Sequence, residues 1–293
     1  MLKAMIQNDD ILDRHGHRYL SQISSKLNIS RISAYGDYGI FSSAPNDELI
    51  LKQYAKTGKW AATTNQALTE FFRDGKGTYL DIGANIGLTV VPIAAKTDVK
   101  CYAFEPEPTN FRNLQINIAE NCRGTNVTAF QFAAFDRKSS LSFEISPNNL
   151  GDHRVRLSGH AGPGFQNEDK RAVIEVSCVR IDDVHLDITP PFFVKIDTQG
   201  AEPFVIAGGR RTLALADCIL MEWSPYHIRR MGGNATAAIE FLKTNFTTGA
   251  IHDDPEAPNS ELRFQSISQV CDALINSLTD WPDSKYVDVA IKR

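Results

Sequence analysis

Short apolar runs alternate along the chain with longer segments in which apolar residues recur every three or four positions. The first pattern predicts buried strands, and the second predicts amphipathic helices. Strand-like runs occupy residues 79–82, 100–104, 127–134, 141–145, 172–179, 192–196, 219–221, 246–251 and 286–291. Helical spacing is found in residues 88–96, 109–120 and 237–242. Strands that alternate with helices are typical of an α/β fold with a mostly parallel sheet.

The first 72 residues precede this alternation and show a different pattern. Residues 48–72 have a helical spacing that Gly58 interrupts, and residues 35–41 resemble a short strand or hairpin. We interpret residues 1–72 as a mainly helical N-terminal cap over the site, and residues 73–293 as the main domain. Structural padding is an equally good interpretation, because this segment carries no decisive chemistry.

The segment Thr78–Thr89, TYLDIGANIGLT, predicts a strand, a tight turn and the start of a helix. Glycines in such a turn let the backbone approach a ligand or a packed helix, and asparagine tolerates the left-handed conformation. Asp81 precedes the first glycine by two residues, and a carboxylate there suits the ammonium group of S-adenosylmethionine better than a pyrophosphate. An ordinary strand-to-helix turn is the alternative. The predicted cofactor contacts in this turn are Asp81, Gly83, Ala84, Asn85 and Gly87.

The strand predicted at 100–104 ends in a second acidic motif, Glu105-Pro106-Glu107-Pro108. Glu105 lies 22 residues beyond Gly83, which is close to the offset of about 20 at which an acidic side chain binds ribose hydroxyls in nucleotide-binding units. Because proline has no N–H to give to a sheet, the chain must leave the sheet there and begin a helix. We therefore predict that Glu105 and Pro106 contact the cofactor, with a surface loop acid as the alternative.

Four blocks of the sequence, taken together, carry a resemblance to a known family. They read LDIGANIGLT, YAFEPEPTNFRNLQINI, VRIDDV and FVKIDTQGAEPFVIAGG. In order and approximate spacing, over residues 35–226, they resemble the FkbM family of class I S-adenosylmethionine-dependent methyltransferases. The resemblance implies a Rossmann-like, doubly wound sheet of seven strands in the order 3-2-1-4-5-7-6. It also implies methyl transfer to a hydroxyl of a sugar, a glycolipid, a polysaccharide or a macrolide.

The end of the run 127–134 is where enzymes of this kind contact the adenine of the cofactor. The resemblance therefore places Ala134, Phe135 and Asp136 around the base. An aromatic ring and small side chains can sandwich an adenine, and Asp136 can accept a hydrogen bond from its amino group. A routine strand end is the alternative interpretation.

Two further predicted strands end in carboxylates, Asp197 after 192–196 and Glu222 after 219–221. Ligands in open α/β sheets bind outside the carboxyl ends of the strands, so we expect both carboxylates beside the glycine turn, where Asp197 would also contact the cofactor. The residues predicted to bind the acceptor are Arg154, Trp223, Tyr226 and His227. The aromatic residues among them are equally compatible with the core.

Two mechanisms are compatible with these residues. In the first, Asp197, Glu222 or His153 is the base that removes the proton of the acceptor hydroxyl; the ordinary pKa of histidine suits this role. In the second, Asp197 and Glu222 hold a magnesium ion that lowers the pKa of the acceptor oxygen. We favour the metal-free mechanism, because the two carboxylates have no clear third ligand beside them.

Composition narrows the function further. The net charge of −4 shows no basic excess that would favour a nucleic-acid partner, and no apolar run reaches the length of a membrane span. The first 20 residues carry acids early and have no continuous apolar core. They do not resemble a signal peptide, and we expect a cytoplasmic protein. The five scattered cysteines support neither a disulfide framework nor a zinc site.

Three competing classes are considered at this point. A nucleic-acid methyltransferase should carry an N-P-P-Y-like tetrad or a reactive cysteine in a Pro-Cys pair, along with a basic face, and the sequence has none of these. A nicotinamide-dependent oxidoreductase would share the fold and Glu105, but it should carry G-x-G-x-x-G, which this turn lacks. A catalytically inactive S-adenosylmethionine-binding or scaffold protein would keep Asp81 and Glu105 while losing the carboxylates at the other strand ends. The sequence indicates neither the individual acceptor nor the oligomeric state.

Overall fold

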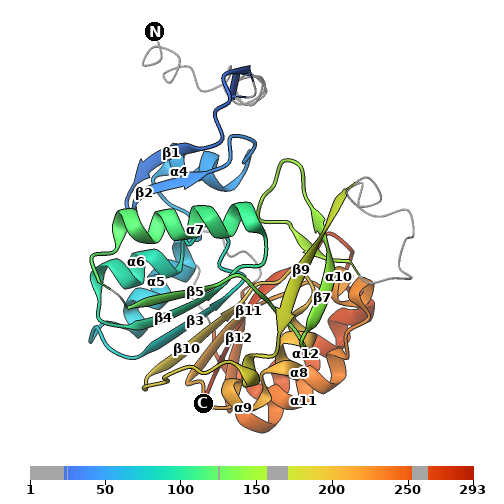
Figure 1. The fold of residues 1–293 in the computed structure, drawn as a ribbon. Helices are drawn as coiled ribbons and strands as arrows, with labels where there is room; N and C mark the ends of the chain where they lie inside the picture. The colour runs from blue at the N-terminus through green and yellow to red at the C-terminus, as the bar shows by residue number, and fades with distance from the viewer. Residues whose placement is uncertain (1–22, 25, 125, 157–170, 253–262) are drawn as a thin grey trace.

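The computed structural model describes residues 23–24, 26–124, 126–156, 171–252 and 263–293 (Figure 1). Its centre is an eight-stranded sheet in the order β13-β12-β14-β11-β10-β3-β4-β5. Neighbouring strands from β5 to β11 are parallel, whereas β14 is antiparallel to both β11 and β12. Without the two-residue β13, this is the order 3-2-1-4-5-7-6. The strands are β3 Thr78–Ile82, β4 Lys100–Phe104, β5 Val127–Phe130, β10 Phe192–Ile196, β11 Cys218–Trp223, β12 Thr248–His252, β13 Gln265–Ser266 and β14 Val287–Lys292.

Helices cover both faces of this sheet (Figure 1). Alternate strand residues point to opposite faces, so Tyr79 and Phe193 pack in one apolar cluster while Leu80 and Val194 pack in the other. The first cluster includes residues of α4 Ile50–Thr57, α5 Ala62–Phe71, α6 Val90–Lys96 and α7 Pro108–Asn121. The second includes residues of α8 Glu202–Gly208, α9 Arg210–Leu213, α10 Pro225–Met231, α11 Ala235–Asn245 and α12 Ile267–Asp280. The near-continuous apolar character of the central strands follows from burial on both faces.

A second sheet of four strands lies beside the first, in the order β6-β9-β7-β8. Its strands are β6 Ala133–Ala134, β7 Ser139–Ile145, β8 Arg154–Val155 and β9 Ala172–Val179. The single strand predicted at 127–134 is therefore two strands in two sheets. The reason is that β4 ends at Phe104, which pairs with Phe130, and the prolines beyond it offer β5 no further partner. The chain leaves the central sheet there, and β6 pairs with β9.

The described part of the N-terminal segment contains a hairpin as well as helices. Strands β1 Ile32–Gly36 and β2 Gly39–Ser43 form the hairpin, and Gly58, with φ +72°, ends α4 before α5 begins. The hairpin is fixed on α7 by two amide side chains: Asn117 bonds both backbone groups of Ser42, and Asn121 donates to the carbonyl of Ile40 at 2.7 Å. The first 22 residues of the predicted cap lie outside the described residues.

Candidate active site

A cavity of about 440 Å³ opens where β3, β4, β10 and β11 end. The residues that follow these strands line it: Gly83 after β3, Glu105 after β4, Asp197 after β10 and Ser224 after β11. This is the edge of an open α/β sheet at which ligands bind, and the volume lies within the range of small-molecule sites, about 300–1,000 Å³.

The turn after β3 has the backbone geometry that the sequence predicts. Gly83 has φ +84°, and a Cβ there would lie 1.9 Å from the carbonyl oxygen of Asp197. Asn85 has φ +51°, the predicted left-handed conformation. A Cβ on Gly87 would lie 2.7 Å from Leu114 of α7, and Gly87 does not line the cavity. The two glycines therefore permit close packing inside the protein, while Gly83, Ala84 and Asn85 form part of the cavity wall.

The structure places Asp81 behind the cavity wall rather than on it. Its side chain has no exposed surface and accepts a hydrogen bond from Thr89 Oγ1 at 2.6 Å. Its Oδ1 lies 3.5 Å from Lys195 Nζ, because Asp81 and Lys195 are direct neighbours in the register of β3 and β10. The expected contact of Asp81 with a ligand ammonium group is therefore corrected: its ammonium partner is Lys195.

Glu105 lies on the cavity wall beside the glycine turn, with Pro106 next to it. Its Oε2 accepts the backbone N–H of Asn85 at 2.9 Å, and its Oε1 accepts that of Glu107 at 2.8 Å. These bonds fix the carboxylate on the turn. Burial raises the pKa of Glu105 to about 8, against the lowering effect of the two hydrogen bonds.

An apolar wall stands next to Glu105, formed by Phe104, Phe132, Ala133 and Ala134. Two of the residues predicted at the adenine are elsewhere. Phe135 is fully buried and stacks on Phe204, with ring centroids 4.5 Å apart. Asp136 pairs with its neighbour Arg137 at 3.1 Å and does not line the cavity. Phe132, which sequence reasoning missed, lies at this wall together with Phe104.

The turn after β10 brings two carboxyl groups together. Gln199 Nε2 donates to Asp197 Oδ1 at 3.1 Å and to Glu222 Oε2 at 2.6 Å. Lys195 Nζ lies 3.3 Å from Asp197 Oδ2. All four residues line the cavity, and 40% of the Asp197 side chain is exposed. Lys195 and Gln199 are further polar residues of the site that the sequence pattern did not single out.

These contacts shift the pKa values of the two carboxyl groups in opposite directions. Desolvation raises the pKa of Glu222 well above its usual value, and the negative charge of Asp197 raises it further. Desolvation also acts on Asp197, but Lys195 and the hydrogen bonds from Glu222 and Gln199 hold its pKa below its usual value. Asp197 is therefore ionised when Glu222 still carries its proton.

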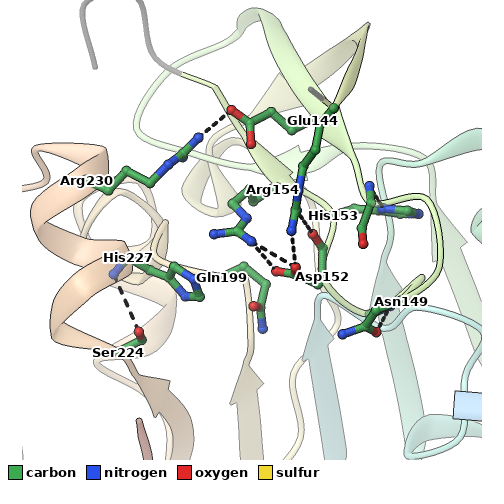
Figure 2. A network of polar contacts seen from close by, with 12 residues as sticks. Glu144, Asn149, Asp152, His153, Arg154, Gln199, Ser224, His227 and Arg230 are labelled. Atoms are coloured by element: carbon green, nitrogen blue, oxygen red, sulfur yellow. Dashed lines mark hydrogen bonds and ion pairs between the residues drawn. The ribbon is translucent and has the colours of Figure 1, made fainter. Parts of the chain in front are cut away.

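The sequence predicts His153 as a base and Arg154 as an acceptor contact. Figure 2 shows where these two residues lie. His153 lines the cavity, but its Nδ1 accepts the backbone N–H of Ser146 at 3.0 Å, and burial lowers its pKa to about 4. Arg154 has no exposed surface and donates to Asp152 at 2.8 Å. Arg171 also pairs with Asp152. Arg154 thus holds Asp152, which lines the cavity, and is not itself an acceptor contact.

Of the three residues predicted to bind the acceptor at the end of β11 and in α10, the structure brings one to the cavity. Trp223 is fully buried in the core, and its Nε1 donates to Ser277 Oγ at 2.9 Å. Tyr226 lies against the ring of His227, 5.4 Å between centroids, and does not line the cavity. His227 does line it, with a pKa that burial lowers to about 4. Trp60 and Tyr286, which the sequence analysis did not predict, also line the cavity.

Two features are absent from the described part of the chain. No group of three or more His, Cys, Asp or Glu side chains within it has an arrangement that could hold a metal ion. No helix among the same residues is both long and apolar enough to cross a membrane.

Comparison with known proteins gives matches to methyltransferases. The crystal structure of methyltransferase FkbM from Methylobacillus flagellatus KT is similar over 85% of this chain and 58% of that chain, with 17% identity and a TM-score of 0.41. The precorrin-6y C5,15-methyltransferase from Geobacter metallireducens GS-15 is similar over 86% of this chain and 94% of that chain, with 14% identity and a TM-score of 0.40. For M. jannaschii TYW2 in complex with AdoMet, the shares are 90% and 85%, the identity is 13% and the TM-score is 0.39.

In sequence, no curated protein matches the chain. The family model of the methyltransferase FkbM domain matches residues 81–253. This range is more than half of the chain, and it contains the glycine turn, Glu105 and the pair formed by Asp197 and Glu222. The chain therefore belongs to the FkbM methyltransferase family.

Proposed function

We propose that the protein transfers a methyl group from S-adenosylmethionine to a hydroxyl group of a sugar, a glycolipid, a polysaccharide or a macrolide-type natural product. One observation carries the proposal: a single cavity is lined both by the glycine turn with Glu105 and by the carboxyl pair of Asp197 and Glu222. The first set suits a nucleoside, and the second suits the removal of a proton from a hydroxyl.

The residues present fit S-adenosylmethionine. An ionised carboxylate has about four acceptor sites, and two of those on Glu105 take backbone N–H groups, so the others can accept from both ribose hydroxyls. Phe104, Phe132 and Ala134 offer the apolar surface for the adenine. When bound, the cofactor supplies an electrophilic methyl group on a sulfonium. Asp197 has the charge to bind the ammonium group, and this contact is the alternative to its role as base.

We assign the role of general base to Asp197. It is ionised, it is 40% exposed, and it lies at the strand end nearest the glycine turn. His153 is less available as a base, because its Nδ1 already accepts the backbone N–H of Ser146. In this proposal Asp197 takes the proton of the acceptor hydroxyl as the oxygen attacks the methyl carbon.

A magnesium ion between Asp197 and Glu222 is less favoured than the metal-free mechanism. Lys195 already places a positive charge 3.3 Å from Asp197, and the proton of Glu222 reduces the negative charge that a cation would meet. Both features make this pair a poorer site for a hard divalent cation than two ionised carboxylates would be.

The lining of the cavity suits a polyhydroxylated small molecule better than a nucleic acid. Trp60 and Tyr286 line it and can stack on a sugar ring, and Asn149 and Ser224, which also line it, can hydrogen-bond to hydroxyls. The net charge of the chain is −4, whereas binding to nucleic acid depends on a basic surface.

The test combines binding with transfer. Calorimetric titration of S-adenosylmethionine into the wild type and Glu105→Ala should give binding that the substitution abolishes in a folded protein. Methyl-labelled cofactor is then offered with sugars, glycolipids and macrolides, with and without EDTA, and an O-methyl ether is sought by mass spectrometry. A wild type that does not bind the cofactor would overturn the proposal. Binding without transfer to any acceptor would favour an inactive binding protein, and activity lost on chelation would favour the magnesium mechanism.

A further inference from the structure

Gln199 occupies an unusual position in the turn after β10. Its backbone has φ +55°, a left-handed conformation that is strained for a residue other than glycine. The next residue, Gly200, packs so closely on α10 that a Cβ there would lie 2.6 Å from the Cβ of His227. The turn is therefore fixed, and it directs the side chain of Gln199 towards the strand ends.

The side-chain amide of Gln199 makes two hydrogen bonds from one nitrogen. Nε2 donates to Asp197 Oδ1 at 3.1 Å and to Glu222 Oε2 at 2.6 Å. Because one nitrogen bonds both, the two carboxyl groups lie close together, and the negative charge of Asp197 raises the pKa of Glu222. Two carboxylates this close repel each other when both are ionised, so one proton between them is the stable state.

Four further ionisable groups lie near the two carboxyl groups. Lys195 on β10 lies against Asp197, with Asp81 of β3 on its other side. Asp288 on β14 is the direct neighbour of Glu222 in the sheet, and burial together with Asp197 raises its pKa to about 7. Glu202 of α8 adds a further carboxyl group whose charge acts on Glu222. Gln199 is the neutral group among them that bonds both carboxyls.

We propose that Gln199 is a positioning residue, whose amide holds Asp197 and Glu222 in the arrangement in which they share one proton. A neutral group with two N–H donors serves both carboxyls without adding charge. A lysine or arginine there would tend to ionise both carboxyls, and a glutamate would add a third negative group. The role of Asp197 as base rests on the proposed function, whereas the arrangement of the carboxyl pair does not.

The consequence concerns the pH range in which Asp197 is ionised. Each hydrogen bond from Gln199 favours an ionised carboxylate, and removing it raises the pKa of the pair. If Asp197 must be ionised to accept a proton, the rate falls as the pH drops through that pKa. Loss of the amide should therefore move the acid limb of the rate profile to higher pH while cofactor affinity stays the same.

The experiment compares Gln199→Met and Gln199→Glu with the wild type, because both substituents are unbranched at Cβ and tolerate the same backbone. Gln66→Met, at an exposed position of α5, is the matched control. The readouts are the pH profiles of kcat and kcat/KM, the Kd of S-adenosylmethionine by calorimetry, and the titration of protonated carboxyl bands by infrared difference spectroscopy. The last two need no acceptor.

For Gln199→Met we expect the acid limb and the first carboxyl titration to move up by about one pH unit, which is about tenfold in rate below the midpoint. Gln199→Glu should move both further, and Gln66→Met neither, with cofactor Kd within about threefold of the wild type throughout. Unchanged titration midpoints in both Gln199 variants would overturn the proposal. If no acceptor is methylated at all, the proposed function fails while the infrared titration still decides the role of Gln199.

Discussion

The turn after β3 and the turn after β10 lie side by side in the sheet and share a backbone design. The N–H of Asp197 donates to the carbonyl of Ile82 at 3.0 Å, and Gly83 packs on the carbonyl of Asp197. Each turn also carries one left-handed residue with a side-chain amide, Asn85 with φ +51° and Gln199 with φ +55°. The two neighbouring strand ends therefore share a left-handed residue that carries a side-chain amide.

The two amides nevertheless have different partners. Asn85 accepts the N–H of Ile86 and donates to the carbonyl of Leu150, so its side chain completes the backbone framework. Gln199 donates to the carboxyl groups of Asp197 and Glu222, so its side chain acts on ionisable groups. We conclude that the amide of the first turn supports the backbone of the cavity wall, whereas the amide of the second turn influences the ionisation of the carboxyl groups there.

The largest effect is expected for Gly83→Ala, which separates the two turns. The new Cβ would lie 1.9 Å from the Asp197 carbonyl, at φ +84°, and the nearest atom is backbone that has little room to move. We expect a loss of about 3 kcal/mol or more in the free energy of unfolding, and no cofactor binding in what remains folded.

Gly75→Ala is the matched control for this change. Gly75 has φ +69°, but nothing lies within 4 Å of its added Cβ, so only backbone strain is introduced. Chemical denaturation should show a loss of about 1 kcal/mol for this variant. Equal losses in the two variants would mean that contact between the turns contributes nothing.

The next largest effect is expected on kcat, from substitutions of Asp197 and Glu222. Asp197→Asn should lower kcat about 10²-fold to 10⁴-fold, because the base is lost, while Glu222→Gln should lower it about tenfold or less. The difference follows from their charges: Glu222 is the protonated member of the pair, which an amide imitates well. Single-turnover rates with saturating acceptor measure both, and a Glu222→Gln defect as large as that of Asp197→Asn would exchange the two roles.

A smaller effect is expected on the pH dependence of cofactor affinity, through Glu105 beside the first turn. The folded pKa of Glu105, about 8, lies above the ordinary value, so the carboxylate that ribose hydroxyls need is formed only as the pH rises through 8. Cofactor affinity should therefore increase about tenfold from about pH 7 to about pH 9. Calorimetry on Glu105→Gln should give weaker binding that no longer varies over this range; a parallel pH dependence in the variant would assign it to another group.

The smallest effect compares the two left-handed residues directly. Glycine relieves the strain at either position, but Asn85→Gly also loses two backbone contacts, and we expect a net destabilisation of about 1 kcal/mol with little change in kcat. Gln199→Gly should leave stability within about 1 kcal/mol and change the rate profile instead. Urea unfolding and pH profiles of the two variants test this difference. If Asn85→Gly changes the rate profile, or Gln199→Gly changes only the stability, the two amides do not have the separate roles that their contacts indicate.

Sequence reasoning worked best where the relevant contacts are local. The β3 turn, the left-handed Asn85 and the placement of Glu105 beside it depend on residues within one strand–helix–strand unit, where spacing and glycine positions carry the information. The seven main strands follow from the same kind of pattern, because burial makes most of their residues apolar.

The sequence predictions were wrong for side chains that could lie either in the core or at the cavity. Phe135 stacks on Phe204, and Trp223 bonds Ser277, 54 residues later in the chain. The functional contacts of Lys195 and Gln199 were missed for a related reason. Lys195 meets Asp81 through the register of two strands, and Gln199 meets Glu222 from a third, and neither pairing is visible in a local pattern.

The origin of the cavity walls has an evolutionary consequence. The family model spans residues 81–253, whereas Trp60 and Tyr286, which also line the cavity, belong to segments before and after it. Part of the cavity wall is thus encoded outside the stretch of the gene that defines the family. Under the proposed function, change in these flanking stretches would alter the lining of the cavity without altering the glycine turn or the carboxyl pair.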